Sequence, residues 1–338
     1  MECDSRPAPL VSVVIPAYNC EKYLREAIDS VLAQTFADYE LIVVNDAATD
    51  STPDVLAEYE QAGKLRVVTH PRNRGLSAAR NSGIAASRGT YVTFLDADDV
   101  WRSEKLEHQV RVLRGRPDLV LLGSRELFFA DGSEYKFPEL PREPRLRELC
   151  WQDLLLGPLG LSPSNAIMKR ECFAEVGGFD ESLTAVEDRD QWIRIVRCFG
   201  GAVEDGVVNA WRFHPDSMSG DPARMKRNEK RVLTKAFRAD DCSLSLRLRA
   251  HAHMYLQIAI TYYEGHDRLR AVEHLAKSVL VWPLPLGREV RRTPMVRWVW
   301  AFKIALGRPV FETLWGAVKR RLRRACGTKD AATRPWPT

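Results

Sequence analysis

The first 125 residues alternate between two kinds of pattern, and this alternation constrains the fold more than any other feature of the chain. Short β-branched runs occupy residues 11–15, 40–44, 65–69 and 91–95, and a further run follows at 119–123. Strands that are separated by helices favour a parallel sheet with right-handed crossovers and helices on both faces. The sequence therefore predicts an α/β fold with a mostly parallel, Rossmann-like sheet.

Helical patterns lie between these runs, at residues 21–34, 53–61, 76–87 and 103–113. In open sheets of this kind, ligands bind at the carboxyl ends of the strands. A polar segment follows each of the first four strands, and the four segments are PAYN, NDAATD, HPRNRG and DADD. We therefore expect one polar crevice along one edge of the sheet.

The chain beyond the sheet pattern differs in composition and charge. Residues 221–338 have helical patterns only, with 25 Lys and Arg against 10 Asp and Glu, a net charge of +15. The whole chain has 50 Lys and Arg and 45 Asp and Glu, so residues 1–220 have 25 Lys and Arg against 35 Asp and Glu, a net charge of −10. An acidic part suits a metal site and a basic part suits an anionic surface. We expect an α/β domain at 1–220 and a basic α-helical region at 221–338.

The basic region offers a membrane partner. Basic residues beside Trp and Leu at 290–325, including the run KRRLRR, favour an interfacial helix on anionic lipid. The alternative is an ordinary helical subdomain with a solvated basic face. The sequence has no recognition motif for nucleic acid, and none is expected as a partner.

Other features bear on the cellular compartment. No apolar run is long enough to cross a bilayer, and the N-terminal residues lack the regions of a signal peptide. The seven cysteines are scattered singly without a CxxC pair, which favours reduced thiols. We expect a cytoplasmic protein, either free or peripheral on the inner face of the membrane.

Three carboxylates, Asp96, Asp98 and Asp99, directly follow the fourth strand. Like charges this close repel one another, and removing them from water is costly. A divalent cation that is held by one or two carboxylates and completed by phosphate oxygens and water would offset that cost. The alternative is a solvated helix N-cap, with Asp99 as the capping residue.

Three segments together resemble glycosyltransferase family 2, the inverting transferases with the GT-A fold. VSVVIPAYNCEKYLREAIDSVLAQTF, ELIVVNDAATDST and NRGLSAARNSGIAASRGTYVTFLDADD match it in order and spacing, over about residues 10–220. The resemblance implies a GT-A nucleotide-diphospho-sugar transferase fold with a donor half at about 10–125 and an acceptor half at about 126–220. It also implies metal-dependent transfer of a sugar from a nucleotide-sugar, with a UDP-sugar expected, to the hydroxyl of a glycan or lipid-linked acceptor. Such enzymes serve polysaccharide and cell-surface glycan synthesis.

The resemblance assigns the donor site. Pro16, Ala17 and Tyr18 match the segment that cradles the nucleotide base, and Asp46 matches the carboxylate that accepts a hydrogen bond from it. Arg80 matches an arginine near the base and diphosphate. The segment NDAA stands where the common family form is Asp-Asp-Gly-Ser, so the loss of the glycine is expected to alter the turn.

The same resemblance assigns the metal and the base. Asp96 is expected toward the ribose and the metal, and Asp98 on the metal, which would be Mg²⁺ or Mn²⁺. His214, in the segment WRFHPDSMS, would be a metal or diphosphate ligand. Asp188 matches the catalytic base that takes the proton from the acceptor hydroxyl. Its place at a helix start favours a charged carboxylate.

Four further residues are expected beside the acceptor or the base. Glu187 and Asp190 flank the base in the sequence, and Asn165 and Trp151 lie between the donor loops and the base. Two other residues, Ser217 and Ser219, close the motif that contains the histidine. The sequence alone assigns none of these a more definite role.

Two other functions stay open. A nucleotidyltransferase also uses an open α/β sheet and a metal-bound carboxylate pair, but it predicts a Gly-rich phosphate loop where PAYNCEKY has no glycine. A catalytically silent scaffold that binds membrane or protein predicts loss of Asp96, Asp98 or Asp188, all of which are present. The chain also has no GxGxxG after a strand, which weakens a dinucleotide-dependent dehydrogenase.

Overall fold

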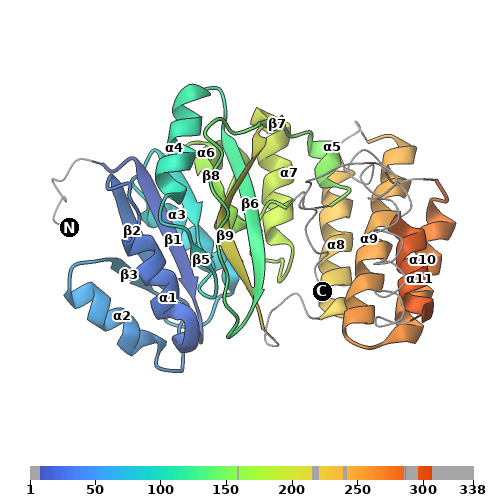
Figure 1. Ribbon diagram of the computed structural model, residues 1–338, viewed down its shortest axis with the longest axis horizontal. Helices are drawn as coiled ribbons and strands as arrows, with labels where there is room; N and C mark the ends of the chain where they lie inside the picture. Colours follow the sequence, from blue (N-terminus) through green and yellow to red (C-terminus); the bar gives the residue numbers. More distant parts are fainter. Residues whose placement is uncertain are drawn as a thin grey trace. The chain divides into compact units, whose positions relative to one another are not determined.

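The computed structural model describes residues 8–157, 160–214, 221–238, 242–284, 286 and 296–306 (Figure 1). The chain divides into two compact units. The first comprises Met1–Met218 and Arg227–Arg238, and the second comprises Ser219–Lys226 and Ala239–Thr338. The described part of the first unit contains a nine-stranded sheet with helices, and that of the second unit is helical.

The parallel half of the sheet confirms the predicted α/β fold. The strands β1 (Val11–Ala17), β2 (Tyr39–Asn45), β3 (Arg66–Thr69) and β4 (Tyr91–Phe94) lie in the order β3-β2-β1-β4, all parallel. The helices that connect or follow them are α1 (Glu21–Leu32), α2 (Thr52–Gln61), α3 (Leu76–Ala86) and α4 (Lys105–Gly115). Pro53 lies in the first turn of α2, where its missing N–H costs nothing.

The other half of the sheet is mixed. The strand β8 (Ala166–Lys169) lies antiparallel between β4 and β6 (Leu121–Ala130), and β9 (Ala202–Phe213) is parallel to β6. Two short strands, β5 (Val100–Trp101) and β7 (Arg147–Glu148), pair antiparallel with β9. The helical pieces of this half are α5 (Trp151–Leu154), η1 (Pro163–Asn165), α6 (Cys172–Val176) and α7 (Glu187–Phe199).

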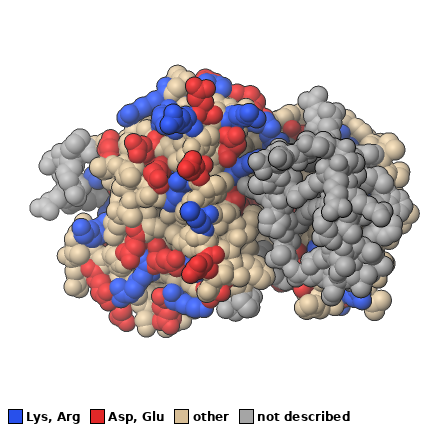
Figure 2. Space-filling view, viewed as in Figure 1, with Lys and Arg blue, Asp and Glu red and all other residues tan. Residues whose placement is uncertain are grey.

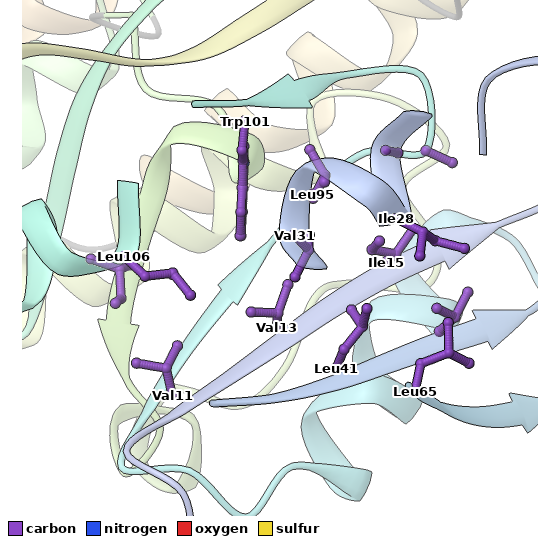
Figure 3. Close-up of a cluster of buried hydrophobic side chains, with 14 of the residues drawn as sticks. Val11, Val13, Ile15, Ile28, Val31, Leu41, Leu65, Leu95, Trp101 and Leu106 are labelled. Atoms are coloured by element: carbon purple, nitrogen blue, oxygen red, sulfur yellow. The ribbon is translucent and has the colours of Figure 1, made fainter. Parts of the chain in front are cut away.

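The two faces of the sheet pack against different helices. Figure 3 shows Val13 and Ile15 of β1 in one buried cluster with Ile28 of α1 and Leu106 of α4. Val14, which points to the other face, lies against Gly83 of α3, where an added Cβ would be 2.2 Å from Val14 Cγ1. Each fully buried aliphatic side chain of this kind stabilises the fold by about 1.5–3 kcal/mol. Thus α1 and α4 cover one face, and α3 covers the other.

The face that α3 covers also receives α7. Phe94 of β4 points to the same face as Val92, and its ring meets Phe179 edge to face at 5.3 Å between centroids. Phe179 in turn contacts Trp192 of α7, with the centroids 6.3 Å apart. Trp192 is fully buried. The helix that begins at Glu187 is therefore fixed to the sheet by an aromatic chain.

The helices after residue 220 agree with the helical pattern of the sequence. They are α8 (Pro222–Ala236), α9 (Leu244–Glu264), α10 (Arg268–Val281) and α11 (Val296–Leu306). From Arg227 onward, α8 belongs to the first unit. No helix in the described ranges is long and apolar enough to cross a membrane. The basic run at 319–324 lies outside the described residues. Acidic and basic side chains are interspersed on the face of the first unit that Figure 2 shows.

Candidate active site

The ends of β1 and β2 form the predicted base-binding loops. Pro16 and Ala17 are buried and Tyr18 is half exposed. The N–H of Asp46 donates to the Ala17 carbonyl at 2.9 Å, which joins the two loops. Base binding by Pro16, Ala17, Tyr18 and Asp46 stays a prediction, because the structure shows their place at the strand ends and not a ligand.

The carboxylate of Asp46 is buried among donors. Its Oδ1 lies 2.6 Å from His70 Nδ1 and accepts a hydrogen bond from the Arg74 N–H at 2.8 Å. Its Oδ2 accepts a hydrogen bond from the Gly75 N–H at 2.7 Å. His70 Nε2 lies 2.8 Å from Ser82 Oγ. These donors compensate the cost of burying the carboxylate. Sequence reasoning missed His70, whose only signal was its place in the polar segment after β3.

The turn beside Asp46 keeps a glycine-like backbone. Ala47 has a φ of 58°, in the left-handed region, and Asn45 Oδ1 accepts a hydrogen bond from Ala48 N at 3.0 Å. A Cβ in this region costs about 1–2 kcal/mol. The alanine therefore takes the conformation that suits glycine, and the neighbouring asparagine side chain helps to hold it.

Arg80 of α3 lies at the centre of the site. It is buried, and its two terminal nitrogens contact Asp96 Oδ1 at 2.7 Å and Glu187 Oε1 at 2.5 Å. Burial alone would lower the pKa of Arg80, but the carboxylates of Asp96 and Glu187 raise it. The guanidinium thus joins the end of β4 to the start of α7, and three residues that the sequence singled out are brought together.

Asp98 and His214 form a second pair of predicted site residues. His214 Nε2 lies 2.9 Å from Asp98 Oδ2, and its buried Nδ1 has no hydrogen-bond partner among the described residues. Burial and the negative charge of Asp96 raise the pKa of Asp98, as expected for a carboxylate without enough positive charge beside it. Ser217 and Ser219 of the same motif lie outside the described residues.

These donors fit a divalent cation that a substrate helps to bind. The described residues contain no cluster of three His, Cys, Asp or Glu side chains that could hold a metal. A partly accessible carboxylate, Asp98, and a buried imidazole, His214, do occur together. Mg²⁺ is commonly held by one or two carboxylates together with substrate phosphates. The Asp98 and His214 pair is therefore adequate for such an ion only when phosphate oxygens complete its shell.

Asp99 is buried and holds the loop after β4 in place. The alternative prediction that it is a helix N-cap is wrong. It is followed by β5, and the next helix begins only at Lys105. Asp99 is buried and accepts hydrogen bonds from Asn209 Nδ2 and from the Arg212 N–H, both at 3.2 Å. Arg212 Nε also donates to the Asp98 carbonyl at 2.9 Å. These bonds hold the carboxylate loop against β9.

Asp188 is the second residue of α7, and its carboxyl has a raised pKa. Burial and the charge of Glu187 raise its pKa to about 7, although Arg80 acts in the opposite direction. Its Oδ1 accepts a hydrogen bond from the Arg189 N–H at 2.7 Å. The N-cap residue of α7, Val186, has a φ of 54°, which is a strained conformation for a β-branched residue. A carboxylate with a pKa near neutrality suits general-base chemistry.

The remaining predicted contacts are engaged elsewhere. Asp190 pairs with Arg194 at 3.0 Å and Lys235 at 2.8 Å. Asn165 is fully buried, and its Nδ2 donates to the Gly160 carbonyl at 2.7 Å. The Arg197 guanidinium lies over the ring of Trp151 at 4.2 Å. Their acceptor roles stay predictions, and the contacts of all three are structural in this conformation.

Comparison with known proteins identifies the family. The model of glycosyl transferase family 2 matches residues 12–177. The chain is also 32% identical over 235 residues to an uncharacterized glycosyltransferase of Rickettsia typhi, an alignment that covers 68% of this chain and 72% of that protein. The chain belongs to glycosyltransferase family 2. Membership of this family favours sugar transfer over the nucleotidyltransferase alternative.

Other relatives share only part of their length with this glycosyltransferase. An uncharacterized glycosyltransferase of Rickettsia felis is 34% identical over 217 residues, and the putative teichuronic acid biosynthesis glycosyltransferase TuaG of Bacillus subtilis is 38% identical over 126 residues. The alignments cover 62% and 37% of this chain. They cover 35% and 50% of the two relatives, so the chain spans about a third to a half of their length.

Solved structures agree on the fold. Staphylococcus aureus TarS 1–349 in complex with UDP-GlcNAc has a TM-score of 0.56 at 17% identity, with 92% of each chain covered. The mannosyltransferase PcManGT from Pyrobaculum calidifontis, in complex with GDP-Man and Mn²⁺, has a TM-score of 0.58 at 19% identity, covering 95% of this chain and 87% of that chain. The glycosyltransferase therefore has the GT-A fold with a helical C-terminal region.

Proposed function

We propose that this glycosyltransferase moves a sugar, with inversion, from a UDP-sugar to the hydroxyl of a saccharide or lipid-linked acceptor in cell-surface polysaccharide synthesis. The observation that carries the proposal is the chain of contacts Asp96–Arg80–Glu187, which places the end of β4 beside the start of α7. Asp98 follows Asp96 by two residues, and Asp188, whose pKa is raised, directly follows Glu187. The printed name of TuaG and the UDP-GlcNAc complex of TarS support the polysaccharide context and the UDP donor.

The donor lies at the carboxyl ends of β1, β2 and β4 in this proposal. Pro16, Ala17 and Tyr18 enclose the base, and Asp46 accepts a hydrogen bond from it. Asp98 and His214 would hold Mg²⁺ or Mn²⁺, and such an ion would supply positive charge to the diphosphate. The Mn²⁺ complex of the mannosyltransferase neighbour supports such an ion.

The acceptor reacts beside α7. Asp188 takes the proton of the acceptor hydroxyl while its oxygen forms a bond to the anomeric carbon. The bond from that carbon to the diphosphate breaks on the opposite side, and the nucleotide leaves with the electron pair. Arg80 positions Asp96 and Glu187, so it fixes the spacing between the donor and the base. General-base catalysis of this kind contributes about 10²–10⁴-fold to the rate.

A ligand screen tests the proposal. Purified full-length protein is titrated with UDP, GDP, CDP and their sugars in Mn²⁺, Mg²⁺ or EDTA, and its melting temperature is followed. We expect UDP with a divalent ion to stabilise the protein. Asp98→Ala should abolish that effect, and Asp54→Ala, at an exposed position of α2, should leave it unchanged.

The same screen has clear contrary outcomes. Stabilisation by UDP that is equal in EDTA would contradict the metal role of Asp98 and His214. Stabilisation by GDP or CDP alone would replace the donor base in the proposal. An Asp188→Asn variant that binds UDP but still turns over at the wild-type rate would remove Asp188 as the base. No stabilisation by any nucleotide would favour the catalytically silent scaffold.

A further inference from the structure

Three aromatic side chains form an exposed row on the sheet, outside the donor site. The row consists of Phe128 of β6 and of Trp211 and Phe213 of β9. Phe128 and Trp211 are paired in register, with their ring centroids 5.4 Å apart, and Trp211 lies 6.2 Å from Phe213. Phe128 is 51% exposed and Phe213 is 58% exposed. Large aromatic rings left in water beside one another mark a binding surface.

The row lies on one side of β9. Side chains alternate along a strand, so neighbours in the sequence point to opposite sides. Arg212, between the two aromatic residues of β9, lies against the rings of Tyr23 of α1 and Phe129, at 4.8 and 4.6 Å. Trp211 and Phe213 therefore point to the other side of β9, away from Tyr23.

The row also lies next to the proposed donor site. Phe213 ends β9, and the next residue, His214, contacts Asp98. The row thus begins beside the proposed reaction centre.

The chemistry of this surface suits a saccharide. A sugar ring has an apolar C–H face that stacks on an aromatic ring and polar edges that stay in water. Ligand sites commonly combine aromatic walls with a few polar groups. The rings are fixed on two paired strands and contact one another, so little side-chain entropy is lost when a ligand binds. An interfacial lipid site would instead place Lys and Arg around the rings. Arg212, between Trp211 and Phe213, points to the opposite side of β9 and pairs with Glu26 and Asp131.

We propose that Phe128, Trp211 and Phe213 bind the saccharide part of the acceptor, with its rings stacked on theirs, and so present a hydroxyl to Asp188. The inference rests on the proposed transferase function and extends it by naming a saccharide as the acceptor class. It predicts that the affinity of the protein for saccharide depends on the row, whereas its affinity for the donor nucleotide does not.

Binding of neutral oligosaccharides tests the row directly. The full-length protein is titrated with oligomers of N-acetylglucosamine, glucose, galactose and mannose, and affinity is measured by calorimetry. We expect at least one series to bind, more tightly as its length increases. Phe213→Ala and Phe128→Ala should each weaken that binding about threefold to tenfold, the loss of one aromatic contact. Phe213→Tyr should retain it.

Two controls distinguish the loss of an aromatic contact in the row from other effects of a substitution on saccharide binding. Phe199→Ala removes a half-exposed aromatic side chain at the opposite end of α7 and should change nothing. Stabilisation by UDP with Mn²⁺ should be the same in Phe213→Ala and in the wild-type protein, which shows that the donor site is intact. If UDP fails to stabilise the wild-type protein, the proposed function fails, and the oligosaccharide result is independent of that outcome.

Three results would overturn the proposal. They are no binding of any oligosaccharide, equal binding by the wild-type protein and Phe213→Ala, and a loss in Phe213→Ala of binding to phosphatidylglycerol vesicles with no change in saccharide binding. The last result would assign the row to a membrane surface.

Discussion

Removing the carboxylate of Glu229 should destabilise the first unit strongly. Glu229 of α8 and Arg189 of α7 form an ion pair, and both are about 95% or more buried. Arg189 also donates to the carbonyls of Leu154 and Leu155 at 2.7 and 2.6 Å. Breaking a buried pair by removing one partner costs about 3–5 kcal/mol, because the other charge stays buried without compensation.

The size of this effect can be expressed as a shift in urea. With a slope of about 2.5 kcal/mol per molar urea, a loss of 3–5 kcal/mol lowers the midpoint of unfolding by about 1–2 M. The variant is Glu229→Gln, which keeps the shape of the side chain and removes its charge. The matched control is Glu273→Gln in α10, because the Glu273 and Lys277 pair is exposed and its loss should leave the midpoint of unfolding unchanged.

Thiol labelling measures each unit separately. Cys172 is buried in the first unit and Cys242 is buried in the second, so each becomes reactive when its own unit unfolds. A thiol reagent is applied at each urea concentration, and the two labels are counted by mass spectrometry. A shift for Cys172 below about 0.3 M in Glu229→Gln would refute the reasoning, since it would mean a cost below 1 kcal/mol.

The same contacts bear on where the catalytic domain ends. Asn228 Oδ1 accepts a hydrogen bond from the Thr184 N–H at 3.1 Å, and Lys235 contacts Asp180 and Asp190, both at 2.8 Å. A chain cut after residue 220 would lack all of these contacts on the segment that leads to Asp188. We therefore propose that the catalytic domain needs the part of α8 from residue 227 to 236, and that such a truncated chain loses turnover.

Three further predictions concern single positions. Because the pKa of Asp188 is raised to about 7, the carboxyl is protonated below that pH, so kcat/KM should rise with pH through about 7 and then level off in a pH–rate profile. Ala47→Gly, at a φ of 58°, should raise the free energy of unfolding by about 1 kcal/mol in urea titration. Gly83→Ala should lower it by about 1–3 kcal/mol, because the new Cβ would lie 2.2 Å from Val14 Cγ1, whereas Gly115→Ala meets no atom within 4 Å and should not.

The sequence by itself determined the parallel half of the fold and the order of its loops. Runs of β-branched residues and the polar segments behind them are local signals, and they placed Asp46, Asp96 and Asp98 at strand ends before any contact was known. Spacing within these motifs also carried the family resemblance. The expectation that Asp188 is the catalytic base came from the resemblance, because an acidic first turn of a helix is a common pattern.

Only the tertiary structure decided how these residues meet. Arg80 and Glu187 are 107 residues apart, and no local pattern shows that one buried guanidinium joins them. The antiparallel strand β8 has four residues, too few for its pairing to be inferred from periodicity. The support from Glu229 and the shared face of Phe128 and Trp211 likewise depend on which segments pack together. Propensity and pattern act within a few residues, whereas the packing of distant segments depends on the whole chain.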